Sequence, residues 1–281
     1  MFGLGTAVFF AASSLLSSRA VKIISSWSVV AWSMLVGLVV TTPFVIASGV
    51  PAALSGANIA WLVASGVGNV TGLVFSALAF RVGKVGVVTP ILATEGALAA
   101  VISALLGESI APIIAFLLLV IVCGVVLVAL GPGRGVLSAV DATAARQAAL
   151  LGLGAGVVFG AVFYASGETA SLGALWAVAA VRAGGVALVS LPVLARGGHA
   201  IPRAMWPWLA GGGLIDTVGY MLVVAGTANG VAITSVLASQ YAVVSVTGGI
   251  VLFRERVVPR QLIGIALTIS GVAALAVVRA V

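Results

Sequence analysis

The sequence predicts an all-α integral membrane protein, with ten transmembrane helices arranged as two inverted five-helix repeats around a central cavity. Three observations lead to this fold class. Of the 281 residues, 62% are apolar and only 7% are charged, with a mean hydropathy of +1.33, whereas soluble domains carry about 25% charged residues. Ten apolar segments are long enough to cross a bilayer. The second half of the chain repeats the first.

The ten apolar segments lie between breaks that are charged or rich in Pro, Gly and Ser. A helix needs about 20 mostly apolar residues to cross the ~30 Å of hydrocarbon in a bilayer. The segments lie near residues 3–18, 27–47, 59–80, 85–106, 111–131, 148–167, 174–194, 206–227, 230–252 and 260–278. No basic flank precedes the first segment and no small-residue cleavage site follows it, so we expect a true span rather than a signal peptide.

The longest break separates the two halves. It reads GPGRGVLSAVDATAARQ and covers residues 131–147. We therefore divide the chain into a first repeat at 1–131, a connecting loop at 132–147 and a second repeat at 148–281.

The two halves share uncommon residues in register. The matches at shifts of 149 and then 147 residues pair Trp27 with Trp176, Pro43 with Pro192, Trp61 with Trp208, Glu108 with Glu255 and Pro112 with Pro259. Matches in Trp, Pro and Glu indicate an internal duplication. Because each repeat has an odd number of helices, the second copy enters the membrane from the opposite side. Inverted repeats of this kind are typical of secondary transporters, whose substrate sites lie near the midplane between the halves.

The end of each repeat resembles a known family. The stretches GESIAP at 107–112 and RERVVP at 254–259, each followed by an apolar helix that contains Gly124 or Gly271, are similar to the end of an EamA repeat of the drug/metabolite transporter superfamily. The resemblance implies a compact ten-helix bundle in which the first four helices of each half enclose a cavity and the fifth and tenth lie peripherally. Within the superfamily, the chain resembles in overall character the exporter branch, which comprises the YddG-like aromatic amino-acid exporters.

Basic residues collect on one side of the predicted membrane. The loops after the first, third, fifth, seventh and ninth segments carry Arg19, Lys22, Arg81, Lys84, Arg134, Arg146, Arg196, Arg203, Arg254, Arg256 and Arg260, whereas the other side has Arg279. Cytoplasmic loops are enriched in Lys and Arg. This distribution places both termini outside the cytoplasm. Eleven Arg against two Lys, with heavy use of Ala, Gly and Val, favours a GC-rich bacterial genome and thus a bacterial inner membrane.

Four charged residues lie within predicted spans or at their ends. Glu95, Asp216 and Arg182 fall near the midplane, and Glu168 falls at the end of its helix. Charged groups in spans are costly, so they face a partner or a cavity. One interpretation is a buried ion pair of Arg182 with Glu95 or Asp216. The other is that an acid binds a proton or a cationic substrate group, because a carboxylate removed from water takes up a proton more readily.

The repeat distinguishes the two acids Glu95 and Glu108. Glu108 has an acidic counterpart in Glu255, whereas the counterpart of Glu95 is Ala242. Glu108 precedes a predicted helix start, where an acid complements the helix dipole, and we interpret it as structural. Glu95 is not required by the duplicated scaffold, and we expect it to face the neighbourhood of Gln240 and Tyr241 across the repeat axis.

Further polar and aromatic side chains are candidates for the cavity wall. The predicted substrate-binding residues, besides Glu95 and Asp216, are Asn69, Tyr220, Gln240 and Tyr241 as polar groups and Phe10, Trp32, Phe159 and Tyr164 as stacking surfaces. Asn69 and Asp216 occupy equivalent repeat positions. Polar residues in spans also serve as ordinary interhelical hydrogen bonds, so that interpretation stays open for each of them. Pro90 removes one backbone hydrogen bond and predicts a kink.

The expected function is secondary transport of small organic solutes by alternating access, as an exporter of amino acids, aromatic ones included, or related metabolites. A proton gradient is the candidate driving force, and the expected partners are the solute and membrane lipid, without nucleic acid. With a single Cys123 and a single His199, we expect no metal site, and without a nucleotide-binding fingerprint we expect no cofactor. The alternatives are a facilitative or exchange carrier for another metabolite or a drug cation, a passive channel, and an integral membrane enzyme.

Overall fold

The computed structural model describes residues 2–129, 139–197, 201–253 and 259–280, and every regular element in these ranges is helical. The elements are α1 (Phe2–Ile23), α2 (Ser26–Ser48), α3 (Gly56–Val82), α4 (Val85–Leu92), α5 (Thr94–Leu105), α6 (Pro112–Ala129), α7 (Ala139–Glu168), the 3₁₀ turn η1 (Ala170–Leu172), α8 (Ala174–Gly185), the π-helical η2 (Val186–Ser190), α9 (Leu191–Ala195), the 3₁₀ turn η3 (Arg203–Met205), α10 (Trp206–Thr227), α11 (Val231–Ala238), α12 (Tyr241–Phe253) and α13 (Pro259–Ala280).

The predicted spans correspond to these helices. Within the described ranges, eight helical stretches are long and apolar enough to cross a membrane, and α6 and α13 contain shorter apolar stretches. The protein is therefore a multi-pass membrane protein. One predicted boundary differs, because α7 begins at Ala139, and residues 139–147 of the expected connecting loop are helical; residues 132–138 lie outside the described ranges.

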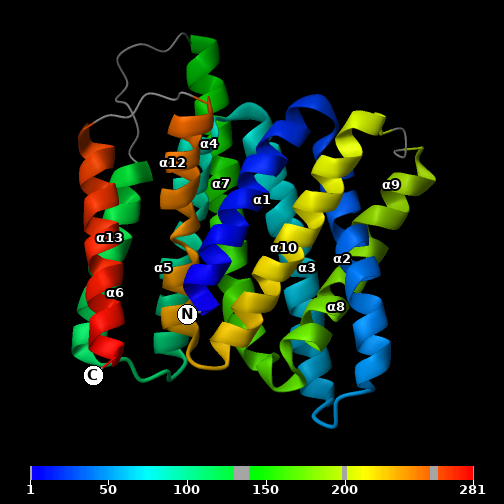
Figure 1. Ribbon diagram of the computed structural model, residues 1–281, viewed down its shortest axis with the longest axis horizontal. Coiled ribbons are helices and arrows are strands. Elements are labelled where there is room, and N and C mark those ends of the chain that lie inside the picture. Colours follow the sequence, from blue (N-terminus) through cyan, green and yellow to red (C-terminus); the bar gives the residue numbers. More distant parts are fainter. Residues whose placement is uncertain (1, 130–138, 198–200, 254–258, 281) are drawn as a thin grey trace.

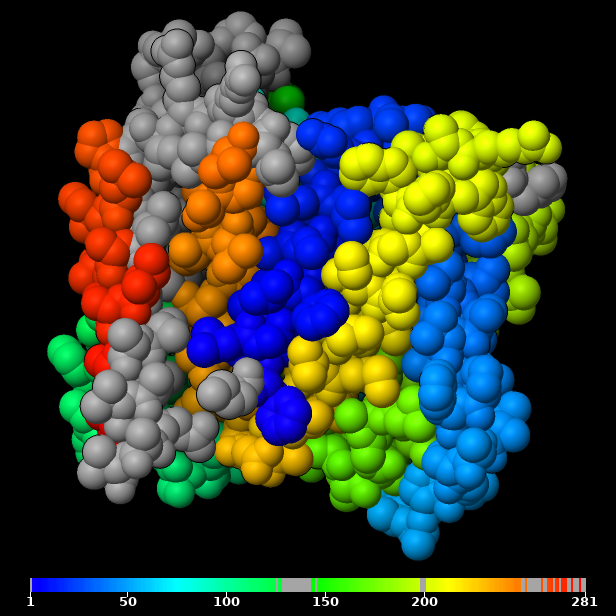
Figure 2. Space-filling model, in the orientation of Figure 1, coloured from blue at the N-terminus to red at the C-terminus, as the bar shows by residue number. Residues whose placement is uncertain are grey.

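The first helices of the two halves run in opposite directions. In Figure 1, α1 rises from the lower end of the bundle, whereas α7 descends from the upper end, and both chain termini lie near the lower end. Helices α6 and α13, the last of each half, pack against each other at one side. On the face shown in Figure 2, α1 is flanked by α10 and α12. The arrangement is that of an inverted repeat.

The outer surface of the bundle carries large apolar side chains, whereas small residues lie at the helix contacts inside it. Large apolar side chains are exposed around the bundle, among them Val39, Phe44, Ile46 and Leu105, and in a bilayer these contact acyl chains. Inside, helices approach closely where a glycine removes a side chain: a Cβ on Gly213 would lie 3.1 Å from the backbone of Ser33. Small residues at contacts are needed in lipid, where burial of apolar surface does not drive helices together.

Two helices are broken at equivalent positions. The predicted spans 85–106 and 230–252 are each divided into two, at Ala93 between α4 and α5 and at Ser239–Gln240 between α11 and α12. Pro90 lies before the first break, but its counterpart before the second break is Leu237. The break is therefore a property of the repeat, and Pro90 is not required to produce it.

The two broken helices cross each other. Helix α4 packs against α12 and α5 packs against α11. At the crossing, a Cβ on Gly96 would lie 2.6 Å from the backbone oxygen of Ser235 and 2.7 Å from Cβ of Ser239, so only glycine fits there. Discontinuous helices that meet near the membrane midplane form the binding sites of many secondary transporters.

Candidate functional site

A cavity lies beside the two helix breaks. Its volume is about 80 Å³, several times the ~10–15 Å³ that one water molecule needs. Side chains from α1, α2, α3, α5, α7, α10 and α12 contribute to its wall. Of the residues expected in the wall, the structure places seven there: Phe10, Asn69, Glu95, Phe159, Asp216, Tyr220 and Tyr241.

Glu95 lies in the first turn of α5, directly after the break. It is 3% exposed, and none of the described side chains forms a hydrogen bond or an ion pair with its carboxylate. The unpaired N–H groups and the dipole of a helix N-terminus favour a negative charge at this position. Tyr241 occupies the matching first turn of α12 and also lines the cavity. The two breaks thus bring a carboxylate and a phenol to one space.

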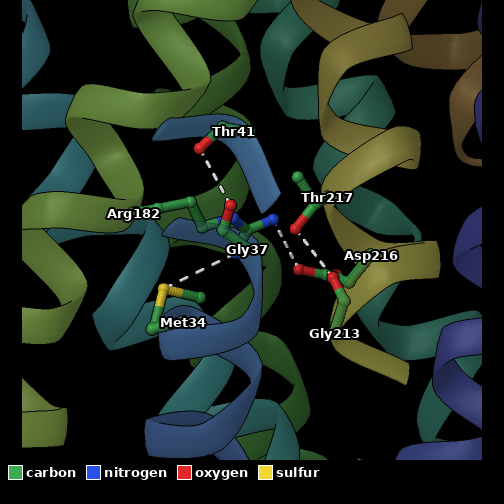
Figure 3. Close-up of polar contacts among 7 residues, drawn as sticks. All are labelled: Met34, Gly37, Thr41, Arg182, Gly213, Asp216 and Thr217. Atoms are coloured by element: carbon green, nitrogen blue, oxygen red, sulfur yellow. Dashed lines mark hydrogen bonds and ion pairs between the residues drawn. The ribbon is translucent and has the colours of Figure 1, made fainter. Parts of the chain in front are cut away.

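The other midplane acid has a partner. Nη2 of Arg182, on α8, donates to Oδ2 of Asp216, on α10, at 2.7 Å, and the Arg182 side chain is fully buried. Figure 3 shows the guanidinium reaching past Gly37 on α2, where a Cβ would lie 2.9 Å from Nε of Arg182. The ion pair therefore requires a glycine at this position of α2. Of the two pairings expected for Arg182, the structure forms the one with Asp216.

The surroundings of Arg182 hold it in place on several sides. Its Nη1 lies 3.5 Å from the sulfur of Met34, and its Cζ lies 5.8 Å from the ring centre of Tyr220. The Tyr220 hydroxyl is in turn 3.0 Å from Oγ of Ser166. Because Arg182 pairs with Asp216, Glu95 is the acid of the cavity wall that has no cationic partner among the described residues.

The cavity wall is aromatic on one side. Phe10 stacks on Phe163 with ring centres 6.5 Å apart and meets Tyr241 edge-to-face at 6.1 Å. Asn69 is 5% exposed, and its Oδ1 has no hydrogen-bond donor in the described structure. A wall that combines aromatic rings with unpaired polar groups suits a flat solute with a polar head.

Three expected site residues lie outside the cavity wall. Trp32 packs edge-to-face on Trp206 at 4.6 Å, and Tyr164 packs on Trp61 at 5.9 Å. Gln240 donates from Nε2 to a backbone oxygen of α11 at 2.8 Å, because the broken helix offers it a free carbonyl. Helical spacing placed these residues at the right depth but could not decide which face of the helix they occupy.

The sequence analysis missed seven polar or aromatic wall residues, namely Ser13, Ser14, Ser17, Ser33, Ser76, Phe80 and Phe163. Ser13 and Ser17 are four residues apart on α1 and share a face. That spacing, within the stretch ASSLLSSR, was the available signal. Serines are common in membrane helices, so composition alone did not distinguish them.

The cavity extends toward the basic end of the bundle. Its lining runs from Glu95 to Ser17 and Phe80, close to the ends of α1 and α3 that carry Arg19 and Arg81. Toward the other end, α1 packs against α10 and α11. There a Cβ on Gly3 would lie 2.7 Å from Cβ of Leu237, so α1 and α11 are in close contact.

Glu108 lies toward that end of the bundle and joins the two repeats. Its carboxylate accepts a hydrogen bond from the backbone N–H of Ala232, at 3.2 Å, in the first turn of α11. The sequence analysis assigned Glu108 to the helix that follows it, but the structure places it at the start of a helix of the other repeat. The physical role, an acid at a helix N-terminus, is the one expected. Glu255 lies outside the described residues.

Comparisons with known proteins agree with this architecture. No curated protein matches the chain. A solved crystal structure of a protein 20% identical in sequence covers 97% of this chain and 94% of its own, with a TM-score of 0.70, and shows that the fold is shared. The model of the EamA-like transporter family matches the chain twice, over residues 1–130 and 146–277, once in each half. The chain therefore belongs to the EamA-like transporter family.

Proposed function

We propose that this protein is a secondary transporter that moves small organic solutes across a bacterial inner membrane by alternating access. The observation that carries the proposal is the cavity at the crossing of two discontinuous helices, one from each inverted repeat. Two similar halves packed in opposite senses can exchange conformations, so that the same site faces each side of the membrane in turn.

Amino acids, aromatic ones included, are the first candidates for the solute. The carboxylate of Glu95 suits an ammonium group, and the amide of Asn69 and the hydroxyl of Tyr241 can serve the carboxylate of a zwitterion. Phe10 and Phe159 offer ring faces to an aromatic side chain. With Arg182 held by Asp216, the ammonium group is the part of the solute that the site recognises by charge.

The proposed direction is export. The basic end of the bundle is cytoplasmic by the distribution of Lys and Arg, and the cavity extends toward that end. In this state the site loads from the cytoplasm. Both termini then lie outside the cytoplasm.

A terminal tag tests the orientation. We expect an epitope tag at either terminus to be labelled from outside, in spheroplasts of intact cells, by an antibody that cannot cross the inner membrane. The matched control is Arg196→Cys, on the basic end, in a protein that lacks the native Cys123; a thiol reagent that cannot cross the membrane should label it only after permeabilisation. A tag protected until the membrane is broken would contradict the proposed orientation.

Counterflow in proteoliposomes tests the transport function. Vesicles loaded with one unlabelled amino acid are expected to accumulate the same labelled amino acid transiently, and the flux should saturate with concentration. A panel that compares aromatic amino acids, aliphatic ones and organic cations identifies the substrate class. Flux that does not saturate and shows no counterflow would indicate a channel and refute the carrier.

A further inference from the structure

A second hollow lies at the basic end of the bundle, away from the central cavity. It has a volume of about 320 Å³ and is lined by Ser25, Trp27, Ser28, Leu188, Val189, Pro192, Val193 and Arg196. The beginning of α2 forms one wall and the η2–α9 segment forms the other; Figure 1 shows α9 beside α2. We call this hollow the α2–α9 groove.

The groove is apolar along its length and polar at its end. Leu188 is 52% exposed and Trp27 is 50% exposed, so the long wall is open to lipid. At the polar end, the exposed guanidinium of Arg196 has no ion pair or hydrogen bond among the described side chains. Ser25 caps α2, accepting from the N–H of Ser28 at 3.0 Å, and the dipole of this 23-residue helix adds a partial positive charge.

The repeat provides an internal comparison for the apolar wall. Shifted by 149 residues, Leu188 corresponds to Val39, Val189 to Val40, Pro192 to Pro43 and Val193 to Phe44, and Trp27 corresponds to Trp176. Both repeats thus keep an apolar wall and a tryptophan. This part of the groove belongs to the duplicated scaffold.

The polar end is specific to the basic side. The residues equivalent to Ser25, Ser28 and Arg196 are Ala174, Ala177 and Ala47. At that equivalent position, Nε1 of Trp176 donates to the backbone oxygen of Gly49 at 2.7 Å, whereas the Trp27 indole has no such bond among the described residues. The duplicated scaffold does not require the cation or the two hydroxyls; Arg196 follows the enrichment of basic residues at this end, and the groove places it beside an apolar wall.

We propose that the α2–α9 groove binds an anionic phospholipid of the cytoplasmic leaflet. Arg196 and the start of α2 bind the headgroup phosphate, and the acyl chain lies along Leu188 and Val193. The charge of the groove matches a phosphate, its apolar wall faces the bilayer, and Trp27 marks the level of the headgroups, where indole rings collect. Basic pockets between transmembrane helices on the cytoplasmic side hold such headgroups.

A bound lipid would join α2 to the helix that carries Arg182. The groove includes part of the π-helical segment η2, which follows α8 directly, and Ser190 of that segment donates to the backbone oxygen of Ala31 on α2 at 2.7 Å. Headgroup binding therefore stabilises a contact between the two repeats at the cytoplasmic end. The proposal does not depend on the identity of the transported solute.

Native mass spectrometry of the full-length protein tests the proposal. The protein is equilibrated in micelles with equal amounts of phosphatidylglycerol and phosphatidylcholine, and the ratio of retained lipids is measured. We expect the wild type to prefer phosphatidylglycerol and Arg196→Gln to lose about fivefold of that preference, the effect of one arginine near an anionic surface. Arg203→Gln, which removes a charge at the same end outside the groove, is the matched control and should keep the preference.

Two further measurements distinguish a lipid site from a site for free phosphate as the source of the preference for phosphatidylglycerol. Inorganic phosphate alone, at the same concentration, should not displace the lipid; displacement would identify a free-phosphate site and overturn the proposal. Ser28→Ala, which removes one hydroxyl of the polar end and leaves the Ser25 cap of α2 in place, should weaken the preference without a large change in the thermal unfolding midpoint in phosphatidylcholine. An unchanged lipid ratio in Arg196→Gln would also overturn it.

Discussion

Replacement of Asp216 by asparagine is expected to lower the free energy of unfolding by about 3–5 kcal/mol, because it leaves Arg182 as an uncompensated buried charge. The carboxylate oxygen lies 2.7 Å from the guanidinium, and the arginine side chain is 0% exposed. No other acid among the described residues contacts Arg182. Unfolding in detergent micelles, followed by tryptophan fluorescence, measures the loss.

Thr217→Val is the matched control for Asp216→Asn. Thr217 is the next residue on α10 and donates within its own helix, to the backbone oxygen of Gly213 at 2.7 Å, so its replacement should cost about 1 kcal/mol. A double variant, Arg182→Met with Asp216→Leu, should recover most of the stability, because exchange of a buried pair for apolar residues is often neutral. An Asp216→Asn protein as stable as the wild type would refute the role of the pair.

The double variant also separates structure from transport. If Asp216 serves to neutralise Arg182, the stable double variant keeps counterflow activity. If the carboxylate binds the solute, counterflow is lost although the protein is folded. The measurement therefore decides between the two interpretations that the sequence left open for this residue.

Replacement of Glu95 by glutamine is expected to abolish flux driven by a pH gradient and to weaken solute binding by about 10–100-fold, the usual value of a hydrogen bond to a charged group. The change keeps the size of the side chain and removes its charge and its site for a transferred proton. Flux into proteoliposomes with an imposed pH gradient measures the first effect, and concentration dependence of counterflow measures the second.

Stability distinguishes a functional role of Glu95 from a structural one. Because no described side chain pairs with its carboxylate and the residue is 3% exposed, removal of the charge should leave the unfolding midpoint unchanged or raise it. Glu168→Gln, an exposed acid at the end of α7, is the control and should leave transport unchanged. Retained pH-driven flux in Glu95→Gln would exclude a coupling role.

The sequence predicted the spans and the repeat because both are one-dimensional patterns. Apolar length fixes where a helix crosses the bilayer, and the matched pairs such as Trp27 with Trp176 record a duplication whatever the packing. The same comparison singled out Glu95, because its counterpart Ala242 lacks a charge. These conclusions needed no knowledge of which helices touch.

To predict the site residues, one must know how each helix is rotated about its axis. Hydropathy does not define this rotation when a helix is apolar on all sides. Tyr164 and Trp32 lie at suitable depths but point to other aromatic residues, and Ser13 and Ser17 face the cavity. Pro90 predicted a kink near the break at Ala93, whereas no residue of the sequence predicted the break at Ser239–Gln240.

The sequence by itself determined that this chain is a duplicated ten-span membrane protein with an unmatched acid at mid-depth. The tertiary structure decided which acid is neutralised. Arg182 reaches Asp216 because α2 presents Gly37 between them, and Glu95 lies in the cavity wall without a partner because α5 begins there. Both outcomes depend on distances of a few ångströms between helices far apart in the chain, and electrostatic pairing in a medium of low dielectric constant is decided at that range.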